Sequence, residues 1–170
     1  MATNIYQSKG STSYTWDDAG TGDVNLITLS ALGAAGVKVG SYQDMGAAPR
    51  PFRYEVEFFI DGFNAAPVVG AIVNLYFTQS NATTGFSGAP TTDPTSSAEG
   101  TGTDKQAFNM TQATPCVVHS TTAGDNLKAV GIVELTGRYI APVVINNTAV
   151  ALLTAGAHLI TLTPIFDQAQ

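Results

Sequence analysis

A cysteine and a histidine three positions apart, Cys116 and His119, are the first candidate for a chemical site. Thiolate and imidazole groups bind zinc, and a structural zinc site takes four such ligands. The segment around Cys116 has the pattern of a strand, in which positions i and i+3 point to opposite faces. The chain has one cysteine and, besides His119, a single further histidine, His158. We therefore expect no metal site here and expect Cys116 to pack as a small apolar side chain.

Two patterns could indicate hydrolysis. Gly85–Ala89 lacks the last glycine of the Gly-x-Ser-x-Gly turn that carries a nucleophilic serine. Glu55 and Glu57 could form a carboxylate pair, but a glycosidase needs one carboxyl group in an apolar pocket. Both residues instead share one face of an alternating segment with Arg53. We expect no catalytic residue, no cofactor and no enzyme activity, and we interpret Arg53, Glu55 and Glu57 as a charged face that is solvated or contacts another protein.

Two further groups of residues suggest ligands. Asp17–Asp23 is acidic and glycine-rich enough to hold calcium, although its spacing is not that of an EF-hand; an ordinary turn is the alternative. Tyr6, Tyr14, Trp16 and Tyr42 could form a flat platform for a sugar, whereas aromatic residues in strands more often pack in a core or against another subunit. We take Tyr14 and Trp16 as candidate interaction residues.

These residues lie on segments whose apolar side chains recur with period two. In Arg53–Asp61, one face collects Tyr54, Val56, Phe58 and Ile60, and the other face is mostly charged. This alternation predicts an antiparallel strand with one buried face. A second long strand is predicted at 68–79, and we expect these two strands to be central.

Further extended segments follow at short, regular spacing, separated by turn residues. They are Tyr14–Trp16, Val24–Leu29, Val37–Tyr42, Lys105–Met110, Cys116–Ser120, Lys128–Leu135, Tyr139–Ile145, Thr148–Leu153 and His158–Ile165. Leu26–Ala35 could also suit a helical turn, but Gly33 makes a long helix unfavourable. The pattern predicts one all-β domain over residues 1–170, a jelly-roll-like antiparallel β-sandwich with a polar N-terminal segment at about 1–20.

Residues 80–104 form a segment of a different kind. They are rich in Ser, Thr, Gly, Ala and Pro, and Phe86 is their one large apolar side chain. Compact domains seldom keep so long a connection without a role. We expect this loop to be mobile in an isolated subunit and to become ordered against a neighbouring copy or another protein, with Phe86 as the docking residue. The alternative is a flexible loop without a role.

Composition excludes several classes of function. The 170-residue chain carries 12% charged residues and a net charge of −6, which argues against binding a nucleic-acid backbone. No apolar run is long enough for a membrane helix, and a single cysteine allows no internal disulfide. The first residues lack the basic start and apolar stretch of a signal peptide.

Several stretches, taken in order, resemble a family of small structural proteins of tailed bacteriophages, of the kind that decorate or cement the capsid. These stretches are Ala34–Lys38, Gln43–Ala48, Arg53–Val56, Ala66–Gly70, Val73–Tyr76, Gly137–Tyr139, Pro142–Asn147 and Leu162–Asp167. They lie within roughly residues 34–80 and 130–170, over half of the chain. The N-terminal 30 residues and the 80–104 loop are outside the resemblance.

The resemblance implies a non-enzymatic virion protein that binds and stabilises the outer surface of the capsid shell. It further implies a homotrimer, the major capsid protein as partner, and assembly in the host cytoplasm. The alternative function is a receptor- or glycan-binding module of a head or tail fibre, which would use the aromatic residues and the exposed loop.

Overall fold

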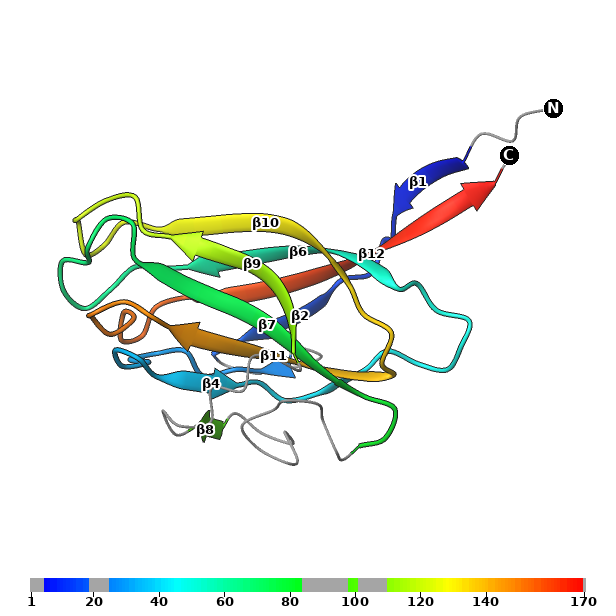
Figure 1. Ribbon diagram of the computed structural model, residues 1–170, viewed down its shortest axis with the longest axis horizontal. Coiled ribbons are helices and arrows are strands. Elements are labelled where there is room, and N and C mark those ends of the chain that lie inside the picture. Colours follow the sequence, from blue (N-terminus) through cyan, green and yellow to red (C-terminus); the bar gives the residue numbers. More distant parts are fainter. Residues whose placement is uncertain (1–4, 19–24, 84–97, 101–109, 170) are drawn as a thin grey trace.

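The computed structural model describes residues 5–18, 25–83, 98–100 and 110–169. These residues form two six-stranded sheets packed face to face, and none of them is helical (Figure 1). Sheet A contains β1 (Ile5–Lys9), β2 (Tyr14–Asp17), β3 (Asn25–Leu26), β6 (Arg53–Ile60), β10 (Leu127–Glu134) and β12 (Leu159–Ala169). Sheet B contains β4 (Val37–Val39), β5 (Gln43–Asp44), β7 (Ile72–Ser80), β8 (Ala98–Gly100), β9 (Thr111–Val117) and β11 (Tyr139–Asn146). The predicted all-β sandwich is confirmed.

The main strands form four antiparallel pairs that are nested within one another along the chain, as in one long hairpin. β2 pairs with β12, β4 with β11, β6 with β10 and β7 with β9, so each pair encloses the next along the chain. The pairs alternate between the sheets, giving the orders β10-β6-β12-β2-β3 and β8-β4-β11-β7-β9. As predicted, β6 and β7 each have a neighbour on both sides.

The alternating pattern places the core between the sheets. Tyr54, Val56, Phe58 and Ile60 of β6 are buried, and the residues between them are half-exposed. Val73, Leu75 and Phe77 of β7 meet them from sheet B. Strand periodicity thus selected the buried face correctly in both central strands.

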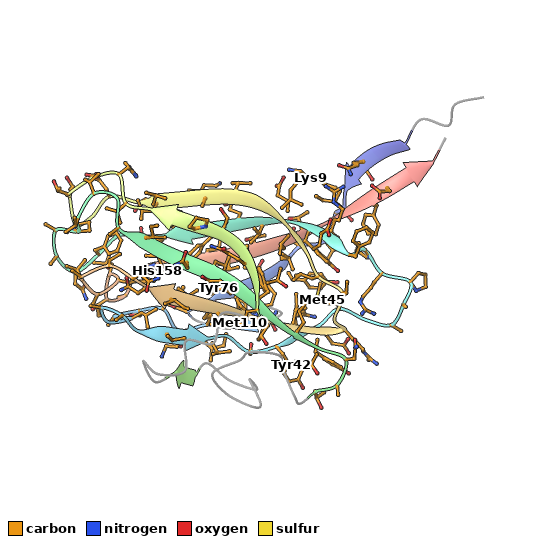
Figure 2. The ribbon with its side chains drawn as sticks, in the orientation of Figure 1. Lys9, Tyr42, Met45, Tyr76, Met110 and His158 are labelled. Atoms are coloured by element: carbon orange, nitrogen blue, oxygen red, sulfur yellow. The ribbon has the colours of Figure 1, made fainter. Side chains whose placement is uncertain are left out.

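Sheet B carries a second, smaller apolar cluster on its outer face. The buried members are Val37, Val39, Met110, Ala141, Val143 and Ile145. Tyr42 and Tyr76 pack against them; both side chains and Met110 are labelled in Figure 2. β11 is therefore buried on both faces, which matches its uninterrupted apolar sequence.

β1 and the last residues of β12 form a two-stranded ribbon that extends past the end of the sandwich (Figure 1). We call Ile5–Lys9 together with Ile165–Ala169 the arm. Ile5 faces Ala169 and Lys9 faces Ile165 in an antiparallel ladder. The arm was missed in the sequence because its strands lie at opposite ends of the chain and its N-terminal strand is polar.

Several predicted segments differ in the structure, and of Cys116–Ser120 the first two residues belong to a strand, β9. Thr148–Leu153 is not a strand, because Asn146 holds this turn from inside: its side-chain amide donates to the carbonyls of Leu32, Gly33 and Val150 at 2.9–3.1 Å. The 80–104 loop is interrupted by β8, whose residues pair with β4. Of Val24–Leu29, two residues form β3, which pairs in parallel with β2. Lys105–Asn109 lies outside the described residues.

Candidate functional site

Cys116 and His119, the first candidates for metal binding, lie in different environments. Cys116 is buried in β9, with Sγ 3.5 Å from the carbonyl oxygen of Phe58, and this burial raises the pKa of its thiol to about 12. His119 is exposed in the following loop. Within the described ranges, no group of three His, Cys, Asp or Glu residues could hold a metal ion. Cys116 thus packs as the small apolar residue that its pattern predicted.

The acidic N-terminal turn is described only at its start, since residues 19–24 lie outside the described ranges. The carboxylate of Asp18 accepts hydrogen bonds from the backbone N–H groups of Leu29 and Ser30. Partial burial raises the pKa of Asp18 above its usual value. This side chain therefore joins two segments of the fold, which is a structural role.

Trp16 is not an interaction residue, and that prediction is wrong. Its side chain is completely buried, its Nε1–H donates to the carbonyl of Ser41 at 2.8 Å, and its ring lies 6.1 Å from that of Phe77. Tyr14 is half-buried against the same core. The strand alternation of β2 explains this placement, because it directs Trp16 between the two sheets. Phe86 and the side chain of Tyr6 lie outside the described residues.

Arg53, Glu55 and Glu57 lie on the outer face of sheet A, as their alternation predicted. Each faces an oppositely charged neighbour: Lys9 Nζ is 2.7 Å from Glu55, Lys128 Nζ is 2.8 Å from Glu57, and Arg53 Nε is 3.8 Å from Glu134. Figure 2 marks Lys9 at the base of the arm. Pairs of this exposure contribute little to stability. The face also carries two exposed aliphatic side chains on β10, Val130 and Ile132.

A hollow of the surface lies beside the arm. Pro49–Arg53 form one wall and Ile165–Asp167 the other, and they enclose about 390 Å³. We call this hollow the arm groove. A smaller hollow is lined by Gly10–Thr12, Tyr14, Pro51, Pro164 and Phe166. The two hollows share Pro51 and Phe166, so Phe166 lines both of them.

Two phenylalanines make the arm groove apolar. Phe52 is 49% exposed and Phe166 is 42% exposed. Counting by twos from the buried residues Tyr54 and Leu162 places both on the inward-facing side of sheet A. Phe166 is exposed because β12 continues past the end of the opposite sheet, and Phe52 lies beside it, directly before β6. Core-like side chains without a facing layer are typical of a protein contact.

The polar groups of the arm groove are mainly cationic. Arg53 Nε is buried and has no hydrogen-bond partner among the described residues. The Arg50 guanidinium donates to the carbonyl of Thr136 at one edge. The one acidic side chain of the lining, Asp167, accepts a hydrogen bond from Gln7 Nε2 at 3.2 Å and is thus held toward β1. The groove therefore offers positive charge next to an apolar surface.

Of the groove residues, the sequence interpretation named Arg53 alone, and it missed Phe52 and Phe166. The available signal was that both continue the inward pattern of their strands. Whether a facing layer covers them depends on the length of the opposite sheet, which local pattern does not report.

A second apolar patch lies at the opposite end of the sandwich from the arm. We call Val68, Val69, Ile72 and Val117 the tip patch; all four are exposed, and Ile72 faces Val117 across β7 and β9. Unlike the arm groove, the tip patch has no charged member.

No protein-family model, no curated protein and no solved structure matches this chain.

Proposed function

We propose that this protein is a non-enzymatic virion protein of a tailed bacteriophage that decorates and stabilises the outer surface of the capsid shell. The observation that carries the proposal is the arm groove, where Phe52 and Phe166 present core-like apolar surface beside two arginines. Such a surface fits a macromolecular partner. The partner proposed here is the major capsid protein. The protein would bind it on the outer surface of the virion, which is assembled in the host cytoplasm.

The strand wiring supports a jelly roll as the finer description of the sandwich. Four strand pairs nested within one another and distributed over two sheets are what results when one long hairpin is wrapped into a sandwich. Jelly rolls are common in viral capsid proteins. Fold alone does not assign function, so this support is an analogy.

The chemistry of the described side chains also supports binding rather than catalysis. Cys116 and Trp16 are buried in the core, and Asp18 is held by backbone N–H groups. The charged residues of β6 are matched with ion-pair partners. These groups hold the fold, which leaves the apolar surfaces for contact with other proteins.

Homotrimer formation is part of the same proposal. A closed ring of identical subunits is the usual form of an assembly of one chain. The tip patch is a second apolar surface, separate from the arm groove, that is free for contact between copies. A ligand selective for the assembled shell stabilises that shell by mass action.

The test uses tailed phage particles assembled without this protein and purified wild-type and variant chains. We expect the wild type to bind along the whole shell in electron micrographs, and Phe52→Ser with Phe166→Ser to lose at least about tenfold in affinity, since two buried aromatic contacts are removed. Val130→Ser with Ile132→Ser is the matched control on another exposed surface and should bind normally. Density limited to a few copies at the tail would reject decoration and favour the fibre module. In that case a glycan array with Tyr14→Ala would test sugar binding.

A further inference from the structure

Inside the arm, one edge of β12 has no neighbouring strand among the residues that the structure describes. β6 accompanies β12 from Leu159 to Ile165, where Arg53 is its first residue. Beyond Ile165 the chain that leads into β6 turns away through Pro49–Pro51, and no described strand pairs with that side of Phe166–Ala169. The opposite side of the same residues is paired with β1.

The backbone groups at this edge can be assigned from the ladder. In an antiparallel pair, a residue directs both its N–H and its C=O to one side, and successive residues alternate. Gly10 N–H donates to the carbonyl of Pro164 at 2.8 Å, so Pro164, Phe166 and Gln168 point toward β1. Asp167 therefore points its N–H and C=O to the unpaired side, into the arm groove.

The groove adds side-chain chemistry to this edge. On the inward side, Phe166 and Phe52 offer apolar surface. At the end next to the sandwich, a strand antiparallel to β12 would arrive at Arg53 and Arg50. Arg53 Nε makes no hydrogen bond among the described residues, and its one ion pair, with the exposed Glu134, is long at 3.8 Å. Asp167 is turned toward Gln7 and does not oppose an incoming carboxylate.

We propose that the arm groove binds an extended segment of another protein by strand addition to Phe166–Ala169. The segment pairs antiparallel with this edge, places apolar side chains on Phe166, and ends at Arg53 with a carboxylate. Unpaired strand edges are templates for this mode of recognition. A two-stranded ribbon is marginally stable by itself in water, so a third strand would also stabilise the arm.

The charges favour another protein over a second copy of this chain. Pairing this edge with itself about Asp167 would place the two Asp167 side chains opposite each other, and like charges opposite each other destabilise a sheet. A segment ending in a carboxylate instead matches Arg53. This inference takes from the proposed function only the source of the segment, the capsid protein.

The test compares two proline variants of the full chain. Asp167→Pro removes the N–H that points into the groove. Gln7→Pro removes the N–H that points away from β12 on the outer edge of β1, by the same alternation. Neither variant removes a hydrogen bond of the arm ladder, and both remove the Gln7–Asp167 side-chain contact. Edge strands tolerate proline where the N–H faces outward.

Binding to capsid shells lacking this protein is measured for both variants. We expect Asp167→Pro to weaken binding at least about tenfold, from one lost hydrogen bond and the steric block of the proline ring. Gln7→Pro releases the Asp167 carboxylate from Gln7 but keeps the Asp167 N–H, so we expect it to weaken binding by much less than tenfold. Equal binding by Asp167→Pro and wild type would overturn strand addition while leaving decoration intact. If Asp167→Pro instead changed only the oligomeric state in sedimentation, the edge would be a self-interface and the occupant proposed here would be wrong.

A second measurement is independent of the capsid. The probe is an acetylated octapeptide of alternating threonine and valine that ends in glutamate, with a matched peptide that ends in glutamine amide. We expect the acidic peptide to slow hydrogen exchange at the Asp167 amide and not at the Gln7 amide, and Arg53→Gln to abolish its preference over the neutral peptide. No protection of Asp167 by either peptide at millimolar concentration would overturn the inference even if the protein decorates shells.

Discussion

The outer faces of the two sheets differ in how far their side chains are exposed to solvent. On sheet A, outward side chains are charged or half-exposed, and Val130 and Ile132 are each 55% exposed. On sheet B, the outward residues Ala141, Val143 and Ile145 of β11 are buried in the second apolar cluster. Sheet A is thus the usual antiparallel sheet with one wet face, whereas the centre of sheet B is dry on both faces. An outward side chain is therefore exposed to solvent in sheet A, whereas in the centre of sheet B it is buried in the second apolar cluster.

The largest expected effect tests this contrast directly. Val143→Asp places an unpaired carboxylate in the second cluster, and we expect a loss of at least about 4 kcal/mol in the free energy of unfolding. Ile132→Asp, an outward residue of sheet A, should change it by less than about 1 kcal/mol. Urea unfolding of both variants measures the difference. Similar losses for the two would remove the distinction between the faces.

Polar side chains also differ in how deeply they are buried. Asn146, at the end of β11, is fully buried; its amide donates to three carbonyls, and its Oδ1 accepts from Thr148 N and Oγ1 at 3.0 and 2.7 Å. We expect Asn146→Ala to cost about 3 kcal/mol, because several buried partners are left without a bond. Asn64, which bonds Thr154 at an exposed site, is the control. A loss below that of Asn64→Ala would contradict a central role for Asn146.

The dependence of stability on alkaline pH tests the burial of two ionisable side chains in the core between the sheets. Burial raises the pKa of Tyr54 from 10.0 and that of Cys116 from 9.0, each to about 12. Between pH 9 and 12 the folded chain therefore holds more protons than the unfolded chain, and the free energy of unfolding falls as pH rises.

Urea unfolding at several pH values across this range measures that slope. Tyr54→Phe and Cys116→Ala should each make the fall shallower, because each removes one group that must ionise on unfolding. A wild-type stability that stays constant from pH 9 to 12 would show that these two groups are not protected from ionisation.

The smallest effect is expected on the wet face. Glu57→Gln removes the 2.8 Å ion pair with Lys128, whose side chain is half-exposed. We expect a loss below about 0.5 kcal/mol that shrinks further in salt. A double-mutant cycle with Lys128→Met isolates the pair energy. A coupling near 2 kcal/mol would mean that the charged face of sheet A contributes to stability far more than its exposure allows.

Local pattern predicted the strands well where one face is apolar and the other polar. β6 and β7 were placed with the correct buried faces, because alternation is a property of the backbone that the side chains report directly. The prediction was wrong at Thr148–Leu153, whose apolar residues suit a strand. There, the side chain of Asn146 bonds the carbonyl of Val150, and the turn replaces the ladder.

The candidate site was less predictable than the fold. Trp16 and Phe166 are both aromatic residues on short alternating segments, and the sequence offers no reason to treat them differently. Trp16 lies under sheet B and is buried, whereas Phe166 lies beyond the end of that sheet and is exposed. Their roles are set by how far the opposite layer extends.

The sequence by itself determined the all-β class, the inward faces of the central strands and the charged face of β6. These follow from neighbours two positions apart along one strand. Only the tertiary structure decided which inward or outward positions are covered. The clearest case is the arm, in which Gln7 and Asp167 face each other from opposite ends of the chain and leave one edge of β12 open. The sequence of one strand does not report which distant strands will pair with it. Whether an edge of that strand stays unpaired is therefore decided only when the whole chain folds.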